Sequence, residues 1–87
     1  MLKRYLVKGH SMEPAFRNGD KLLVSSLLFK LKKDDVIVFK NGNRDYLKRI
    51  KAVFGKSGFL VTGDNKGHTG SWKIARKQIK GKLLMKY

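Results

Sequence analysis

One stretch in the middle of the chain limits the possible folds more than any other. Residues 35–40 read Asp-Val-Ile-Val-Phe-Lys, and Asn41-Gly42-Asn43 follow directly. An unbroken run of β-branched and aromatic residues predicts a strand that is buried on both faces, and the Asn-Gly pair is typical of a tight hairpin turn. Residues 45–54 are then the predicted return strand. Apolar side chains must therefore cover both sides of the first strand of this hairpin.

Further short apolar segments, separated by turn residues, continue this pattern along the chain. Their close spacing predicts an all-β fold, a small coiled or barrel-like antiparallel sheet with little helix. The 87 residues are enough for one domain, residues 1–87, and too few for a second. Residues 25–33 fit either a short amphipathic helix or a loop. The other predicted strands are residues 5–7, 21–25, 59–62 and 79–85.

The composition excludes several kinds of site. The chain has no cysteine, two histidines and six acidic residues, so disulfides and thiolate metal sites are excluded and we expect neither a metal nor a cofactor. The longest apolar run, residues 22–29 with two serines included, is far shorter than the ~20 residues that a spanning helix needs. We therefore expect a chain that is soluble or peripheral to a membrane, without a transmembrane segment.

The net charge of +15 indicates an anionic partner or a strongly solvated surface. Such a field attracts nucleic-acid phosphates and anionic membranes alike. The lysines and arginines are scattered along the chain and are not gathered into one arm, which argues against specific nucleic-acid binding. An anionic membrane surface stays open as a partner, with Met12 and residues 27–29 as the expected apolar contacts.

Ser11 is the candidate nucleophile. It lies beside Met12, which we expect to be exposed, and is followed by Pro14 and by a Gly19-Asp20 turn before the next predicted strand. A serine in such a turn more often bonds its own backbone. An alcohol becomes a useful nucleophile only when an adjacent base removes its proton, so a base must be found elsewhere in the chain.

Lys48 is the candidate base because of its place in the predicted return strand. Side chains alternate between faces in a strand, and the face that carries Lys48 is otherwise apolar. Desolvation on that face would lower the lysine pKa toward the range of a general base. The alternative is a lysine whose stem crosses the core and whose ammonium reaches water. The apolar members of this face are Tyr46, Ile50, Ala52 and Phe54, and the opposite, expected solvent side carries Asp45, Arg49 and Lys51.

Together these segments resemble the type I signal peptidases, serine proteases with a Ser/Lys dyad, over nearly the whole chain. The resemblance implies that Ser11 is the nucleophile, that Lys48 is the general base, and that an extended peptide is cut. The matching boxes, in order, are Gly9-x-Ser11-Met12-x-Pro14, Gly19-Asp20-x-Leu22-x-Val24, Tyr46-Leu47-Lys48-Arg49-Ile50, Gly63-Asp64-Asn65 and Ile79-Lys80-Gly81-Lys82.

The resemblance also assigns roles around the dyad. It implies an oxyanion and substrate site at Gly9, Ser11, Met12 and Pro14, and supporting roles for Gly63, Asp64, Asn65 and Thr69. The chain departs from the family pattern at Ser71 and Lys73, which cannot form the Asp/Arg pair found there in other members. Gly9 stands where some members carry an oxyanion-hole serine.

The chain is also similar to shortened members of the family, the maturation proteases of nickel superoxide dismutase, because only 12 residues separate Ile50 from Gly63. The leading hypothesis is a soluble or peripheral endopeptidase that removes a signal or leader peptide with small residues before the cut.

Two other function classes stay open. A self-cleaving repressor-type Ser/Lys protease would need an Ala-Gly or Cys-Gly linker ahead of the serine and a DNA-binding domain, and neither is found in these residues. A non-enzymatic basic β-barrel that binds nucleic acid would use exposed aromatic rings for stacking, although core packing is the commoner role for such rings. The candidate rings are those of Tyr5, Tyr46, Phe59 and Trp72.

Overall fold

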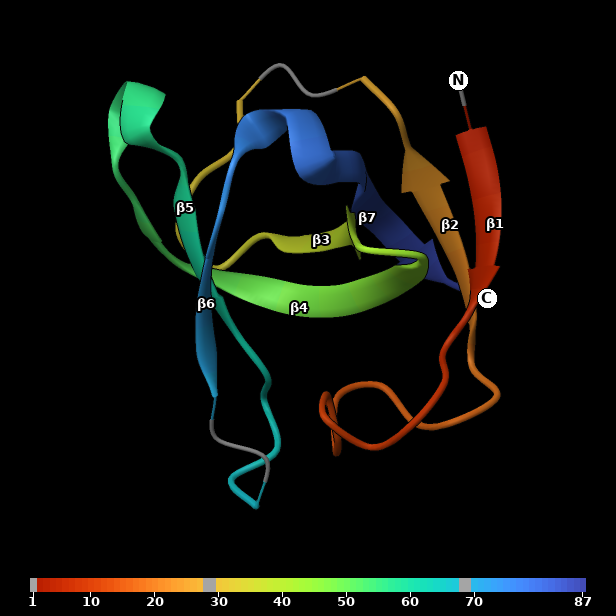
Figure 1. Ribbon diagram of the computed structural model, residues 1–87. Coiled ribbons are helices and arrows are strands. Elements are labelled where there is room, and N and C mark those ends of the chain that lie inside the picture. Colours follow the sequence, from red (N-terminus) through yellow and green to blue (C-terminus); the bar gives the residue numbers. More distant parts are fainter. Residues whose placement is uncertain (1, 28–29, 68–69) are drawn as a thin grey trace.

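The chain forms one coiled antiparallel sheet (Figure 1). The computed structural model describes residues 2–27, 30–67 and 70–87. Within them the strand order is β1-β2-β7-β3-β4-β5-β6, so β1 and β6 are the edges of the sheet. The predicted all-β class is confirmed. The elements are β1 (Leu2–Leu6), β2 (Lys21–Ser25), β3 (Val36–Asn41), β4 (Arg44–Val53), β5 (Phe59–Thr62), β6 (Ser71–Ile74) and β7 (Ile79–Lys86), with 3-10 turns η1 (Gly55–Ser57) and η2 (Arg76–Gln78).

Strand β3 separates two hydrophobic clusters, as its unbroken apolar sequence predicts. Alternation sends Ile37 and Phe39 to one side and Val36 and Val38 to the other, and all four are buried. The first cluster consists of Leu31, Ile37, Phe39, Ile50, Phe59, Val61, Ile74 and Ile79, with Tyr46 and Trp72 packed against it. The second consists of Val7, Met12, Phe16, Leu22, Val24, Val36 and Val38, with Tyr5, Leu47 and Leu83 packed against it.

Strand β4 keeps the predicted alternation only as far as Ile50. A register shift against β5 between Ile50 and Ala52 breaks the pattern, and Phe54, expected on the apolar face, lies beyond the strand end with 47% of its surface exposed. The opposite face is not a solvent side either, because Leu47 packs against the second cluster. Both corrections come from tertiary packing, which a single strand pattern does not contain.

One local alternative, a helix or a loop at residues 25–33, can be decided for the described residues. Ser26, Leu27 and residues 30–35 form no helix, which favours the loop over the helix; Leu28 and Phe29 lie outside the described part. Strand β6 was not predicted. No helix in the described ranges is long and apolar enough to cross a membrane.

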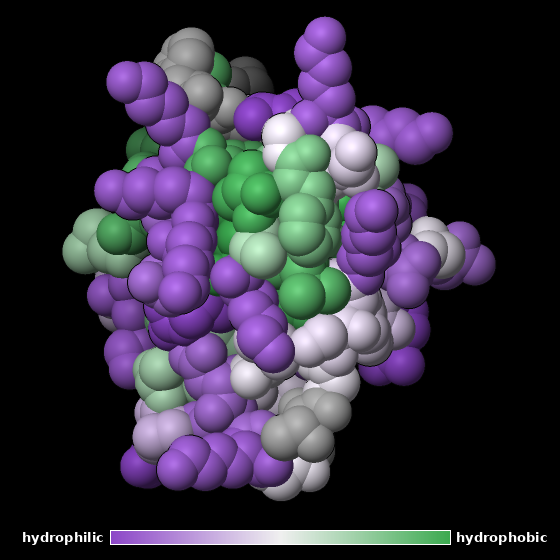
Figure 2. Space-filling view, turned by 90° about the vertical axis from the view of Figure 1, so that its left-hand side faces the viewer, coloured by the Kyte–Doolittle hydropathy of each residue, from purple (hydrophilic) through white to green (hydrophobic). Residues whose placement is uncertain are grey.

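Hydrophilic side chains surround an apolar patch on the side formed by β5 and β6 (Figure 2). Val53 and Phe54, at the end of β4, are among the exposed large apolar residues of the chain. Lys73 Nζ on β6 lies 5.5 Å from the centre of the Phe54 ring. At least one lysine of this region therefore lies against an apolar ring.

Candidate active site

The loop between β1 and β2 carries Ser11 and is held by its own hydrogen bonds. The backbone N–H of Phe16 donates to the Met12 carbonyl at 2.9 Å, and that of Gly19 donates to the Val7 carbonyl at 2.8 Å. Met12 is only 2% exposed and belongs to the second cluster. The expectation that Met12 is exposed, and with it a membrane contact through Met12, is therefore wrong. Its burial anchors the half-buried Ser11 to the core.

Gly9, His10 and Pro14, which lie close to Ser11 in the sequence, are exposed. The Gly9 backbone has φ +88°, a conformation that favours glycine, and its N–H donates to Asn18 Oδ1 at 2.9 Å. His10 Nδ1 contacts Glu13 Oε2. Pro14 is exposed and follows a cis peptide bond. Gly9 therefore allows the chain to turn at this point, but its N–H is already hydrogen-bonded to Asn18 Oδ1 and is not free to bind another group.

The turn from Gly63 to Asn65 touches the Ser11 loop directly. The Asn65 backbone N–H donates to the Ser11 carbonyl at 2.8 Å, and Asn65 Nδ2 donates to the His10 carbonyl at 2.8 Å. A Cβ on Gly63 would lie 2.5 Å from the Ser11 carbonyl oxygen and 3.3 Å from Ser11 Cβ. The absence of a side chain at Gly63 is thus what allows the turn to reach the serine.

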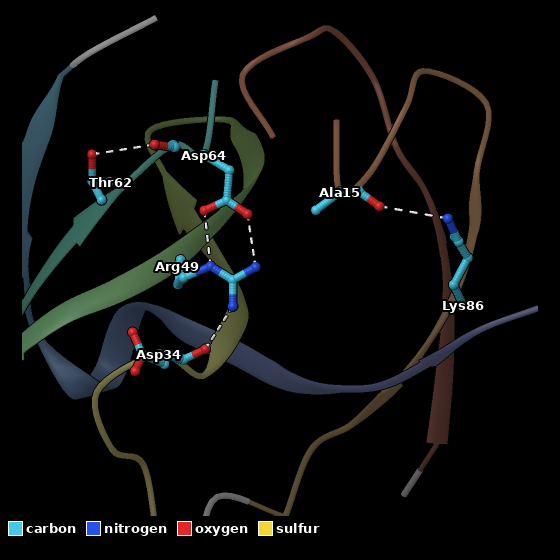
Figure 3. Close-up of polar contacts among 7 residues, drawn as sticks. Ala15, Asp34, Arg49, Thr62, Asp64 and Lys86 are labelled. Carbon is cyan, nitrogen blue, oxygen red and sulfur yellow. Dashed lines mark hydrogen bonds and ion pairs between the residues drawn. The ribbon is translucent and has the colours of Figure 1, made fainter. Parts of the chain in front are cut away.

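Asp64, the middle residue of this turn, binds the strand that carries Lys48 (Figure 3). Arg49 Nε donates to Asp64 Oδ1 at 2.8 Å and Nη2 donates to Oδ2 at 2.7 Å, while Nη1 donates to the Asp34 carbonyl at 2.9 Å. The Asp64 side chain raises the Arg49 pKa. Sequence reasoning left an Asp/Arg support in doubt because of Ser71 and Lys73, but the structure contains such a pair built from Asp64 and Arg49.

This bidentate pair should contribute measurably to stability. Asp64→Asn removes the charge and places an amide donor against a guanidinium donor, and we expect a loss of about 1–2 kcal/mol in the free energy of unfolding, reduced by the partial exposure of both side chains. Asp45→Asn, an exposed position on β4, is the matched control. Urea unfolding of both variants checks this, and equal midpoints would show that the pair contributes nothing.

Ser11 and Lys48 line the same cavity, of about 380 Å³, between the Ser11 loop and β4. Gly9 and Met12 line it as well, whereas Pro14, Gly63, Asp64 and Asn65 do not. Thr69, the expected supporting hydroxyl, lies outside the described residues. The wall consists of Tyr5, Leu6, Val7, Lys8, Gly9, His10, Ser11, Met12, Leu22, Val38, Arg44, Asp45, Tyr46, Leu47, Lys48 and Trp72.

Lys48 is half-buried in this wall, on the side of β4 that faces the first cluster. Burial lowers the pKa of its amine below the ordinary lysine value of 10.5. Within the described residues, Lys48 Nζ forms no ion pair with a carboxylate and no hydrogen bond with Ser11 Oγ. Catalytic contacts are often loose before substrate binds. The arrangement therefore supplies a hydroxyl and an amine of lowered pKa to one cavity.

Sequence reasoning overlooked two residues of this region. Arg49 was assigned to solvent, although an arginine on a strand face that also carries Leu47 is a signal for a buried partner. For Trp72, core packing was the commoner role expected and is confirmed, because its ring packs against the first cluster, but its place in the cavity wall was missed. The alternation of Ser71-Trp72-Lys73-Ile74 would have predicted a strand with Trp72 and Ile74 on one face. Among the described residues, no group of three His, Cys, Asp or Glu side chains is arranged to hold a metal ion.

Comparison with known proteins adds a second kind of observation. The family model described as "Signal peptidase, peptidase S26" matches residues 1–67. Signal peptidase IB of Staphylococcus aureus is 40% identical over 55 residues, which cover 59% of this chain and 29% of the relative. Signal peptidase I of Aquifex aeolicus is 36% identical over 86 residues, which cover 91% of this chain and 32% of the relative. The chain thus spans less than a third of the length of these curated relatives.

Proposed function

Because this chain belongs to the peptidase S26 family of signal peptidases, we propose that residues 1–87 form a catalytic domain that cuts a signal or leader peptide from a protein substrate. The observation that carries the proposal is the shared cavity of Ser11 and Lys48. Family membership makes peptide-bond hydrolysis the expected chemistry, and the presence of Ser11 and Lys48 in the wall of one cavity supports a Ser/Lys dyad.

In the proposed reaction Lys48 acts as the base. Its neutral amine takes the proton from Ser11 Oγ as that oxygen bonds to the scissile carbonyl carbon. The resulting ammonium then gives the proton to the departing amine when the C–N bond breaks. The neutral Lys48 then takes a proton from a water molecule as the water oxygen bonds to the ester carbonyl carbon, and it returns that proton to Ser11 Oγ when the ester C–O bond breaks. The lowered pKa of Lys48 supports this role, since a fully protonated lysine cannot accept the proton.

The oxyanion of the tetrahedral intermediate needs a hydrogen-bond donor. Gly9 N–H is already bonded to Asn18. The backbone N–H of Ser11 forms no hydrogen bond within the described residues, and we assign it the main donor role. The contacts of Gly63 and Asn65 with Ser11 and His10 support this assignment, because they hold the His10–Ser11 peptide group, which contains that N–H, and the Ser11–Met12 peptide group that follows it.

The substrate should bind as an added strand. The edge strand β1 offers unpaired backbone groups, and Tyr5 and Leu6 at its end line the cavity. Alternate substrate side chains would then point into the protein. The family resemblance implies small residues at the two positions, spaced two apart, that precede the cut. Selectivity should accordingly depend on the size of these side chains and not on their charge.

A peptide library tests this specificity. Extended peptides that carry Ala, Ser, Leu or Lys at the two positions are incubated with the protein, and the products are mapped by mass spectrometry. We expect cleavage after Ala-x-Ala at a rate at least about 100-fold above that of the Leu and Lys peptides, with no cleavage by Ser11→Ala. Cleavage after lysine, or by Ser11→Ala, would refute the proposed function.

A further inference from the structure

Trp72 forms part of the cavity wall, beside Tyr46 and Lys48 of β4. It lies on the edge strand β6, where it pairs with Val61 of β5, and its half-buried side chain packs against the first cluster. Two aromatic neighbours fix the orientation of the indole. Tyr46 and Phe39 meet it edge to face, at centroid distances of 4.8 Å and 5.8 Å and interplanar angles of 81° and 83°. A ring held by two such contacts presents a fixed face to a third group.

That third group is the amine of Lys48, whose Nζ lies over the Trp72 ring, 5.3 Å from its centre. Tryptophan gives the strongest cation–π attraction of the aromatic residues at such a distance, and the attraction grows when the pair is desolvated. In the part of the chain that the structure describes, no carboxylate pairs with Lys48. Among the described residues, the face of the Trp72 ring is therefore the group that attracts the Lys48 ammonium.

We propose that Trp72 is the positioning residue of Lys48: its ring face holds Nζ in the cavity and stabilises the ammonium that forms during the reaction. This inference rests on the proposed function and adds a residue to it. A carboxylate in the same place would hold the lysine protonated and would prevent it from acting as a base. An aromatic face attracts the cation more weakly, so the amine stays in position and still loses its proton.

Other titratable or charged groups surround the cavity and must stay constant in a test. They come from β1, from the Ser11 loop and from β4; Arg49 and Asp64 are paired with each other nearby. Lys73, next to Trp72 on β6, contacts Phe54. A change that is confined to the Trp72 ring leaves all of them in place. The cavity members of this set are Tyr5, Lys8, His10, Arg44, Asp45 and Tyr46.

Trp72 is the single tryptophan of the chain, which allows a change of ring electrons without a change of shape. The protein is produced with 5-fluoro-, difluoro- or trifluorotryptophan, because each fluorine makes the ring face less negative. The titration of Lys48 is followed by NMR with ¹³Cε-labelled lysine, and the Lys48 signal is assigned from Lys48→Arg. We expect the midpoint to fall stepwise, by up to about 1 pH unit in the trifluoro protein, as the ammonium loses its attraction.

Peptidase assays on the same proteins give the second readout. The acid limb of the kcat/KM profile should shift to lower pH in step with the NMR midpoint. A midpoint that stays unchanged across the fluorinated series would overturn the proposal. The NMR titration needs no activity, so it decides the role of Trp72 even if the wild-type chain cuts no peptide, a result that would count against the proposed function alone.

Discussion

Lys48→Arg should lower kcat/KM on an Ala-x-Ala peptide by at least about 10³-fold and leave the sheet intact. The guanidinium keeps the positive charge and much of the length of the lysine, yet it stays protonated at any working pH and cannot accept the proton of Ser11. Lys73→Arg, an exposed change on β6, is the control and should retain full activity. Rates are measured by peptide cleavage, and folding is compared by urea unfolding.

The pH profile of the wild-type chain is a second test of Lys48 as the base. Burial lowers the Lys48 pKa, and in the proposed mechanism the neutral amine is the active form. Activity should therefore rise with pH, with its midpoint below the ordinary lysine value of 10.5. Full activity of Lys48→Arg, or activity that does not rise with pH at any point below 10.5, would remove Lys48 from the mechanism.

Gly63→Ala should damage both stability and activity. The new Cβ would lie 2.5 Å from the Ser11 carbonyl oxygen, and backbone cannot move aside as a flexible side chain can. We expect a loss of about 1–3 kcal/mol in the free energy of unfolding. Turnover should fall by about 100-fold, because a displacement of the nucleophile by about 1 Å has an effect of that size.

Gly67→Ala is the matched control for this variant, since a Cβ there meets its nearest atom, Asn65 Oδ1, at an ordinary 3.5 Å. It should behave as the wild type in both assays. If Gly63→Ala retained wild-type turnover, the contact between the turn and the Ser11 loop would have no part in placing the nucleophile.

The parts of the fold that depend on local sequence were predictable. The unbroken apolar run of β3 requires burial on both faces, and the structure places a cluster on each side of it. The bounds predicted for β2 and β5 match those observed, because turn residues flank both segments. Alternation along β4 correctly predicted that Lys48 lies on the face of the first cluster. The alternation fails only after Ile50, where the register of β4 against β5 shifts.

The remaining features depend on contacts between distant residues. Met12 lies in a loop, and only the packing of that loop on strand residues of the second cluster, such as Val24 and Val38, decides that Met12 is buried. Arg49 and Asp64 are 15 positions apart, and their pairing follows from the register of β4 against β5, which places Arg49 opposite Thr62, two residues before Asp64. The contact of Lys48 with Trp72 likewise needs β6 to lie beside β5, an arrangement that the short sequence of β6 did not reveal.

Covalent labelling of Ser11 tests the central claim most directly. A peptidyl diphenyl phosphonate that ends in Ala-Ser-Ala should form a stable ester with an activated serine. Intact mass and peptide mapping should locate one adduct on Ser11 of the wild type, formed faster as the pH rises. Ser11→Ala should form none, and Lys48→Arg should react at least about 10³-fold more slowly. An adduct on another residue, or labelling of Lys48→Arg at the wild-type rate, would contradict the Ser11/Lys48 dyad.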